Sequence, residues 1–265
     1  MTAWETICRN AGEALVASGV ENGRQEARWL VDFAVKNGRS PEQFDEMVRR
    51  RVNGEPLQYI MGSCDFYGFE LMVGKGVLIP RPETEVLVEI AEQLLTGDEA
   101  VLDLCTGSGA IALALAALKP NAQITGVDIS PDALFYARSN QKRLKVENVR
   151  WLEGDLFAPL AKDEAFGMIT SNPPYVAPTE YEQLETVVKD YEPKLALVAE
   201  NEGLAIIQRI IDGAKGHLKD GGWLLMEIGE EQGGRVLKML SDAGFRETRV
   251  QKDYAGKDRI AVGKR

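Results

Sequence analysis

The feature that most constrains the fold is a regular alternation of apolar, strand-like segments and helical segments that starts at Ala100. Alternation of this kind is typical of a doubly wound α/β sheet, because each helix carries the chain back to the edge where the next parallel strand begins. Two final segments on either side of Ala255-Gly256 predict a terminal hairpin. The sequence therefore predicts a mostly parallel, seven-stranded, Rossmann-like sheet. The expected strands are 101–104, 123–128, 149–152, 167–171, 222–228, 245–250 and 259–262, with helices at 110–118 and 131–143 among the connections.

The part of the chain before this alternation has a helical pattern. Apolar residues recur there at helical spacing, and Ser40, Pro41 and Gln43 have the arrangement of an N-cap, a first-turn proline and a capping-box partner. Near its end, Phe66–Val73 alternates as strands do, so we expect a hairpin between two domains. The predicted domains are a small all-helical domain at residues 1–73 and a sheet domain at residues 74–265.

Composition narrows the class of protein. A net charge of −10 and a pI of about 4.9 argue against nucleic acid as a direct partner. No segment approaches the roughly 18 apolar residues of a membrane-spanning helix, and the N-terminus lacks the layout of a signal peptide. The three cysteines are far apart and lack metal-ligand spacing, so we expect reduced thiols, no metal site and a cytoplasmic location. We also expect a monomer.

A run of arginines and the one histidine are the basic features that bear on function. The run Arg49-Arg50-Arg51 crosses the end of a predicted helix, and it forms either a solvated helix face or a docking patch for an acidic partner. The one histidine, His217, leaves no room for a His-based triad or a multi-histidine metal site. We place it at the solvated end of a helix.

A glycine-rich loop joins the first strand of the sheet domain to its helix. Glycines let the backbone approach a ligand closely and turn sharply into a helix N-terminus. Asp128 follows Gly107 by 21 residues (128 − 107), where a carboxylate can bind the ribose hydroxyls of a nucleotide cofactor. These features alone fit a nicotinamide dinucleotide, S-adenosylmethionine, or a purely structural turn. The candidate cofactor-binding residues are Cys105, Thr106, Gly107, Ser108, Gly109 and Asp128.

An acid just before this loop favours S-adenosylmethionine. Asp103 stands two residues ahead of Cys105, where it would lie near the amino group of a methionine moiety. The same carboxylate would repel a dinucleotide pyrophosphate. A salt-bridged or capping role for Asp103 is the alternative.

The end of the fourth strand carries the tetrapeptide Asn172-Pro173-Pro174-Tyr175. Ligands bind at the carboxyl edge of open α/β sheets, and two prolines stiffen the chain there. The Asn172 side chain and the Pro173 carbonyl offer two acceptors for the NH2 group of a planar amide or amine, and Tyr175 offers a flat apolar face. A simple tight turn is the alternative. The tetrapeptide predicts a class I S-adenosylmethionine-dependent methyltransferase that acts on such a nitrogen.

Taken together, these motifs resemble those of the release factor glutamine methyltransferases (the HemK/PrmC family). The resemblance covers nearly the whole chain from Glu55, whereas the first fifty residues fit the family's helical domain only loosely. Its specificity comes from the joint occurrence of several motifs in the right order. The matching segments are 55–62, Ile79-Pro80-Arg81-Pro82-Glu83-Thr84-Glu85, the loop at 103–109, the tetrapeptide at 172–175 and 252–259.

The resemblance implies a substrate and a set of roles. The family methylates N5 of the glutamine in the Gly-Gly-Gln motif of class 1 peptide chain release factors. By this resemblance Asn172, Pro173 and Tyr175 clamp the glutamine amide, residues 105–109 and Asp128 bind the cofactor, Leu156 covers its adenine, and Asn172 also contacts it. Two residues depart from the family pattern. Cys105 stands where many relatives have glycine, and Leu156 stands where some have an aromatic residue.

Four other functions remain to be separated from this one. An adenine-N6 methyltransferase would use the same clamp, but it needs a basic groove that the composition does not indicate. A ribosomal-protein glutamine methyltransferase is disfavoured by the intact Arg81-Pro82-Glu83-Thr84 stretch. A nicotinamide oxidoreductase lacks a hydride-handling acid or base other than His217. A non-enzymatic cofactor-binding module would not need the tetrapeptide.

Overall fold

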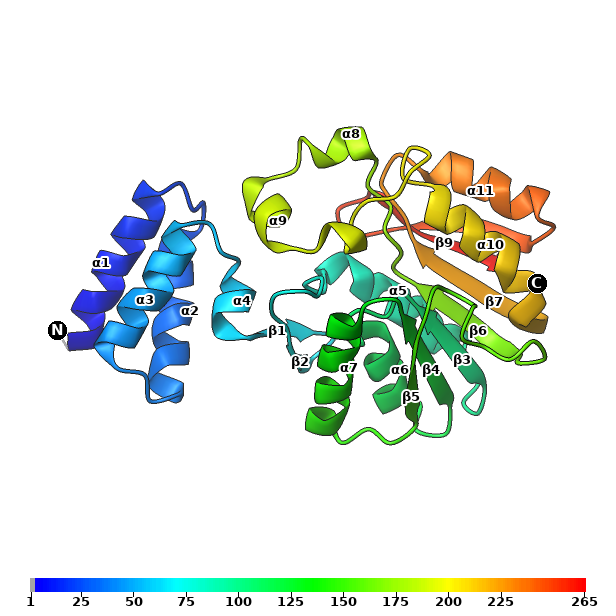
Figure 1. The fold of residues 1–265 in the computed structure, drawn as a ribbon, viewed down its shortest axis with the longest axis horizontal. Coiled ribbons are helices and arrows are strands. Elements are labelled where there is room, and N and C mark those ends of the chain that lie inside the picture. Colours follow the sequence, from blue (N-terminus) through cyan, green and yellow to red (C-terminus); the bar gives the residue numbers. More distant parts are fainter. Residues whose placement is uncertain (1–2) are drawn as a thin grey trace.

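In the computed structural model, which describes residues 3–265, the larger part of the chain is a seven-stranded sheet covered by helices on both faces (Figure 1). The strand order is β5-β4-β3-β6-β7-β9-β8; the first five run parallel, and β9 pairs antiparallel with both β7 and β8. All seven predicted strands are confirmed. They are β3 (Ala100–Leu104), β4 (Gln123–Asp128), β5 (Val149–Glu153), β6 (Phe166–Ser171), β7 (Leu218–Glu227), β8 (Arg246–Lys252) and β9 (Asp258–Lys264).

Two apolar layers hold the helices against the sheet. Helices α5 (Glu85–Leu94) and α6 (Ala110–Leu118) pack on one face, where Val101 points. Helices α10 (Ala205–His217) and α11 (Gly233–Asp242) pack on the other face, where Leu102 points. Successive strand residues face opposite sides of a sheet, so a strand that is apolar on both sides is stable only with both faces covered.

Strand β7 differs from its prediction. It begins at Leu218, directly after α10, whereas the sequence predicted a turn at Asp220-Gly221 and a strand from residue 222. The two residues lie inside the strand, where the pairing between β6 and β7 shifts register. Gly221 has a φ of +79°, a conformation that glycine adopts without strain. The sequence Asp220-Gly221 therefore produces a shift in strand register within a longer strand, and not a turn before it.

The N-terminal helices form a separate unit, which we call the helical unit (residues 3–61). It consists of α1 (Ala3–Ala17), α2 (Gly23–Lys36), α3 (Pro41–Val52) and the short α4 (Leu57–Met61) around its own apolar cluster. The predicted capping box is present: Ser40 Oγ accepts from the Gln43 backbone N–H (3.3 Å), and Gln43 Oε1 accepts from the Ser40 N–H (3.0 Å). This cap fixes where α3 begins.

The run Arg49-Arg50-Arg51 is engaged within the helical unit. Arg49 pairs with Glu46, and Arg50 pairs with Glu55 at 2.6 Å. Arg51 pairs with Glu26 of α2 at 2.5 Å, and both of these side chains are largely buried. Neither of the two predicted interpretations describes Arg51, because its ion pair joins two helices of the unit.

A hairpin links the helical unit to the sheet. Strands β1 (Ser63–Phe66) and β2 (Phe69–Met72) meet at Tyr67-Gly68, whose positive φ values of 49° and 78° suit a tight two-residue turn. The hairpin was predicted at 66–73, and its first strand starts three residues earlier. Asn140 of α7 (Pro131–Leu144) bonds both Met72 N (2.6 Å) and Met72 O (3.0 Å), so the hairpin is fixed against the sheet domain. A domain boundary at residue 73 stays a prediction.

The segment between β6 and α10 was not predicted. It contains α8 (Pro178–Tyr181), α9 (Thr186–Tyr191) and the 3-10 turn η2 (Lys194–Ala196), and Figure 1 shows it arching from the sheet domain toward the helical unit. The Tyr191 hydroxyl donates to Asn53 O at 3.0 Å. The buried Glu192 carboxylate accepts from Ile79 N at 3.1 Å and pairs with Arg81. These contacts attach the segment to the domain linker. Among the described residues, no helix is long and apolar enough to cross a membrane.

Candidate active site

A cavity opens at the carboxyl ends of β3, β4 and β6, where the sequence predicted a ligand site. Its wall combines the glycine-rich loop with residues from the linker and from the segment after β6, including Pro80, Leu195 and Val198. Of the predicted residues, those that line it are Cys105, Thr106, Gly107, Ser108, Asp128, Leu156, Asn172 and Pro174. The structure therefore brings together the loop, the acid of the second strand and the start of the tetrapeptide.

Gly109 is the one predicted cofactor residue that lies outside the cavity wall. Its φ is +81°, and a Cβ added there would lie 2.8 Å from the ring of Trp151. The absence of a side chain lets the start of α6 pack against that ring. Gly109 therefore has a packing role that the sequence pattern did not distinguish from ligand contact.

Asp128 organises the loop through both of its oxygens. Oδ2 accepts from the Gly107 backbone N–H (2.8 Å) and Oδ1 accepts from the Ser130 N–H (2.9 Å). Each oxygen keeps a further lone pair, so the carboxylate can accept a pair of adjacent hydroxyls. Burial raises the pKa of Asp128 above its ordinary value, and the two backbone hydrogen bonds oppose that rise. This arrangement fits the ribose of an adenosine-containing cofactor.

Asp103 lies elsewhere than its sequence position predicted. It is fully buried and does not line the cavity. Its two oxygens accept from the hydroxyls of Thr106 and Thr170, the latter at 2.8 Å. Burial raises the pKa of Asp103 to about 7. The carboxylate supports the loop from inside the sheet, which is closer to the alternative structural role than to contact with a methionine amino group.

The tetrapeptide presents only part of itself to the cavity. Asn172 and Pro174 line it, whereas Pro173 is buried and Tyr175 turns its hydroxyl to Glu227 Oε1 at 3.0 Å. Asn172 Nδ2 donates to Thr84 Oγ1 at 3.2 Å. The clamp roles of Pro173 and Tyr175 stay predictions.

Comparison with known proteins decides the family. A family described as a methyltransferase domain matches residues 95–241, and one described as the PrmC N-terminal domain matches residues 39–62. The release factor glutamine methyltransferase of Vibrio cholerae is 40% identical over 274 residues, covering 98% of this chain and 96% of that protein. That of Geobacter sulfurreducens is 40% identical over 264 residues, covering 94% and 92%. The chain belongs to the release factor glutamine methyltransferase family.

Solved structures agree on the fold of this family member. A Pyrococcus furiosus methyltransferase has a TM-score of 0.57 at 19% identity and covers 75% of this chain and 89% of that one. A ribosomal protein L11 methylase from Lactobacillus delbrueckii subsp. bulgaricus has a TM-score of 0.53 at 19% identity, covering 73% and 83%. The predicted class I methyltransferase fold with a helical N-terminal part is confirmed.

Several residues of this methyltransferase site were not found from its sequence. Asp155 lines the cavity just after β5, and Arg209 of α10 pairs with it at 2.8 Å. Asp155 could have been identified from the sequence, because it is an acid that follows the third strand of the sheet domain. Ligands bind at the carboxyl ends of such strands, and the same rule identified Asp128. Arg209 carries no local signal, because it joins the cavity only through the packing of distant elements. Thr84 stands in the stretch at 79–85 that carries the family resemblance, but no sequence pattern assigned it to the cavity.

His217 belongs to the packing at the end of α10 and not to the cavity wall. His217 ends α10 as predicted, but it is half-buried and stacks on Phe157 with ring centroids 5.1 Å apart. Burial lowers the pKa of His217, and the residue does not line the cavity. Across residues 3–265 no group of three or more His, Cys, Asp or Glu side chains is arranged to hold a metal ion.

Proposed function

We propose that this chain transfers a methyl group from S-adenosylmethionine to the side-chain amide nitrogen N5 of the glutamine in the Gly-Gly-Gln motif of class 1 peptide chain release factors. The observation that carries the proposal is similarity to release factor glutamine methyltransferases along almost the entire chain. The cavity supports it, because one wall holds the ribose acceptor Asp128 and another holds Asn172.

The cavity residues fit the cofactor from end to end. Asp128 would accept the ribose hydroxyls, and the backbone of residues 105–108 would lie close to the ligand. Leu156 would contribute an apolar surface for the adenine, and the preceding residue, Asp155, also lines the cavity and pairs with Arg209. S-adenosylmethionine supplies a methyl group on a positively charged sulfur, which is the electrophile of the reaction.

The protein must compensate for a weak nucleophile. The lone pair of an amide nitrogen is delocalised into the carbonyl group, so the nitrogen becomes positive only as the new bond forms. Acceptors that hold the two N–H groups gain strength at that point and stabilise the transition state. We assign these acceptors to Asn172 Oδ1 and the Pro173 carbonyl. Alignment of nitrogen, methyl carbon and sulfur within about 3–3.5 Å supplies much of the remaining rate.

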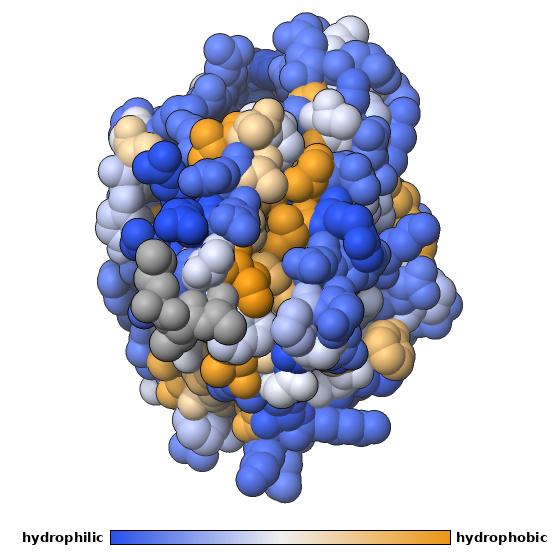
Figure 2. All heavy atoms as spheres, turned by 90° about the vertical axis from the view of Figure 1, so that its left-hand side faces the viewer, coloured by the Kyte–Doolittle hydropathy of each residue, from blue (hydrophilic) through white to orange (hydrophobic). Residues whose placement is uncertain are grey.

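We assign recognition of the protein substrate to the helical unit. A clamp that holds one glutamine side chain cannot distinguish a release factor from other proteins that display glutamine. Figure 2 shows the end of the molecule where the helical unit lies, with a band of apolar side chains between hydrophilic flanks. Large apolar side chains of the unit that are substantially exposed are Val16, Trp29, Val35 and Val52. Such residues suit a docking surface for a folded protein.

The remaining assignments follow from this activity. We propose a monomeric cytoplasmic enzyme whose partner is the release factor itself, with no direct contact to nucleic acid. The acidic composition and the free thiols of Cys8, Cys64 and Cys105 support this.

One experiment tests the function against its rivals. The purified chain is incubated with labelled S-adenosylmethionine and, in separate reactions, with class 1 release factors, ribosomal proteins and DNA. We expect label on the release factor glutamine only, located by peptide mass analysis. Label on adenine or on a ribosomal protein, with none on release factors, would replace the proposal with one of those activities.

A further inference from the structure

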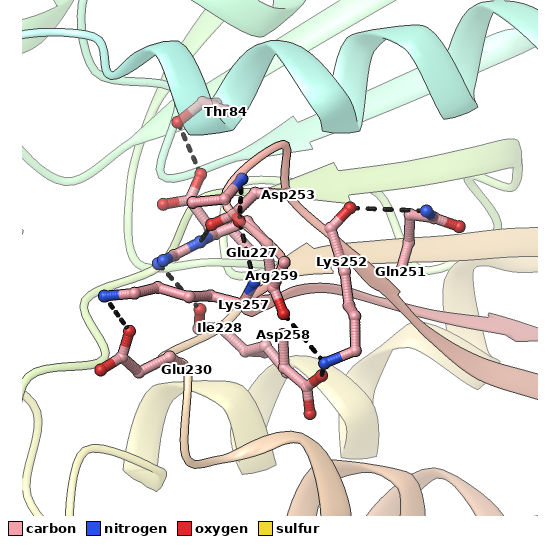
Figure 3. A network of polar contacts seen from close by, with 12 residues as sticks. Thr84, Glu227, Ile228, Glu230, Gln251, Lys252, Asp253, Lys257, Asp258 and Arg259 are labelled. Atoms are coloured by element: carbon pink, nitrogen blue, oxygen red, sulfur yellow. Dashed lines mark hydrogen bonds and ion pairs between the residues drawn. The ribbon is translucent and has the colours of Figure 1, made fainter.

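A hydrogen-bonded chain leads from the buried interior to the cavity. Glu227, at the end of β7, is 1% exposed, and its Oε2 accepts from the Thr84 hydroxyl at 2.5 Å. Figure 3 shows this contact, with Thr84 entering from the start of α5 and Glu227 lying below it. Thr84 Oγ1 in turn accepts from Asn172 Nδ2 at 3.2 Å. Glu227 and Thr84 thus connect two distant segments of the chain to Asn172, the residue predicted to hold the substrate nitrogen.

The number of hydrogens fixes the direction of this chain. Glu227 Oε2 accepts from the Thr84 hydroxyl, so this contact consumes the single hydrogen of that hydroxyl. Thr84 Oγ1 then has only lone pairs left to offer Asn172. The group of Asn172 that faces Thr84 Oγ1 is therefore the NH2 group. Asn172 Oδ1 is left on the other side of the amide, away from Thr84.

Both oxygens of Glu227 act as hydrogen-bond acceptors. The hydroxyls of Thr84 and Tyr175 donate to separate oxygens, at 2.5 and 3.0 Å. Burial raises the pKa of Glu227; these two hydroxyls and the positive charge of Arg259 oppose the rise, and Glu83 adds to it. Arg259 is itself held by Asp253 at 3.1 Å and lies beside Glu227 in Figure 3.

We propose that Glu227 and Thr84 are positioning residues that lock the Asn172 amide with Oδ1 toward the substrate. In the opposite orientation Asn172 would present an NH2 group to the NH2 group of glutamine, and two donors cannot bond to each other. Locking the acceptor in place before the reaction removes a reorganisation step from the transition state. This inference rests on the proposed function, because it assumes that Asn172 holds an amide nitrogen.

Substitutions at both ends of the chain test the proposal in the full-length enzyme. Thr84→Val keeps the shape of the side chain and removes the hydroxyl, whereas Thr84→Ser keeps the hydroxyl. Glu227→Gln replaces a pure acceptor by a group that can also donate to Thr84 and reverse the chain. Glu230→Gln is the matched control, because Glu230 follows Glu227 closely and pairs with Lys257 at 2.6 Å, away from Asn172.

The expected result separates kcat from binding. Single-turnover methyl transfer should slow roughly 10- to 100-fold in Thr84→Val and Glu227→Gln. The Kd for S-adenosylmethionine, measured by calorimetry, should stay within about 2-fold, and Thr84→Ser should recover most of the rate. Wild-type rates in Thr84→Val, or equal losses in Thr84→Val and Thr84→Ser, would overturn the proposal. If Thr84→Val does not fold, the rate of Glu227→Gln tests the proposal instead, because it changes the opposite end of the hydrogen-bonded chain.

A second readout does not depend on activity. Hydrogen exchange of the Asn172 side-chain NH2, followed by NMR, should be slow in the wild type and in Thr84→Ser and faster in Thr84→Val. Unchanged exchange in Thr84→Val contradicts the positioning role even if the enzyme proves to have another substrate. A wild-type enzyme that transfers no methyl group to release factors contradicts the proposed function instead, so the two failures are distinguishable.

Discussion

Asp128 and Gly107 are joined directly, because the carboxylate of Asp128 accepts the backbone N–H of Gly107 at 2.8 Å. We propose that this one carboxylate both shapes the loop and accepts hydrogen bonds from the cofactor. A loop that is already held in place loses less conformational entropy when the cofactor binds. The spacing of 21 residues seen in the sequence spans α6 and β4, which bring Asp128 back to the edge of the sheet where Gly107 lies.

Removal of this carboxylate should weaken cofactor binding. In Asp128→Ala the ribose hydroxyls lose their acceptors and the Gly107 N–H loses its partner, so affinity for S-adenosylmethionine should fall by about 1–3 kcal/mol. Calorimetry measures this loss. Asp132→Ala is the control, since Asp132 is an exposed acid four residues away that does not line the cavity. Equal affinities of Asp128→Ala and the wild type would remove Asp128 from the site.

Substitution of Asn172 should affect turnover more than cofactor affinity. Asn172→Ala removes an acceptor that acts mainly on the substrate nitrogen, and loss of one such preorganised group lowers kcat by roughly 10²–10³. Single-turnover methyl transfer at saturating cofactor measures the effect. A wild-type rate in this variant would mean that the glutamine amide is held by other groups.

The buried acid Asp103 should make stability depend on pH. Burial raises its pKa from 3.8 to about 7 in the folded chain. Between these values the folded chain holds a proton that the unfolded chain has lost, so the free energy of unfolding falls as pH rises from about 4 to 7 and then levels off. The contribution of this one group is roughly 2 kcal/mol between pH 5 and 7.

Comparison with Asp103→Asn isolates this contribution. The asparagine cannot ionise, so its variant should gain stability relative to the wild type as pH rises through this range. Urea unfolding at pH 5, 6, 7 and 8 gives the two curves. If they run parallel, Asp103 does not titrate between the folded and unfolded states in the expected range.

The parts of this enzyme that were predictable from sequence depend on local patterns. Asp128 and Asn172 each follow an apolar strand, and the carboxyl ends of parallel strands share one edge of the sheet. That rule places both residues in the cavity without further information. The capping box at Ser40 is local in the same sense, since all its members lie within four residues.

The parts that were missed depend on packing between distant segments. Thr84 and Glu227 are 143 positions apart, and nothing in either neighbourhood indicates that they touch. Asp103 was assigned to the ligand side because it adjoins the loop, yet its side chain points into the sheet toward Thr170. The sequence shows where a residue stands along a strand. The direction of a side chain near the end of that strand depends on the twist of the sheet and on the neighbouring strands.

The last prediction concerns recognition by the helical unit. The side chain of Trp29 on α2 is half-exposed, and aromatic residues contribute strongly to protein interfaces. We expect Trp29→Ala to lower kcat/KM on an intact release factor by roughly 10-fold, a typical loss for one interface anchor. Activity on a short peptide that contains Gly-Gly-Gln should stay the same, because the peptide lacks the release-factor surface that would dock on the helical unit.

Two comparisons make this test specific to docking. Phe135→Ala removes another exposed aromatic side chain, on α7 of the sheet domain, and should change neither substrate's kcat/KM. Cofactor affinity reports whether the fold is intact in both variants. If the helical unit only stabilised the fold, Trp29→Ala would affect protein and peptide alike. Equal losses on the two substrates, or no loss on the intact release factor, would therefore contradict docking through this face.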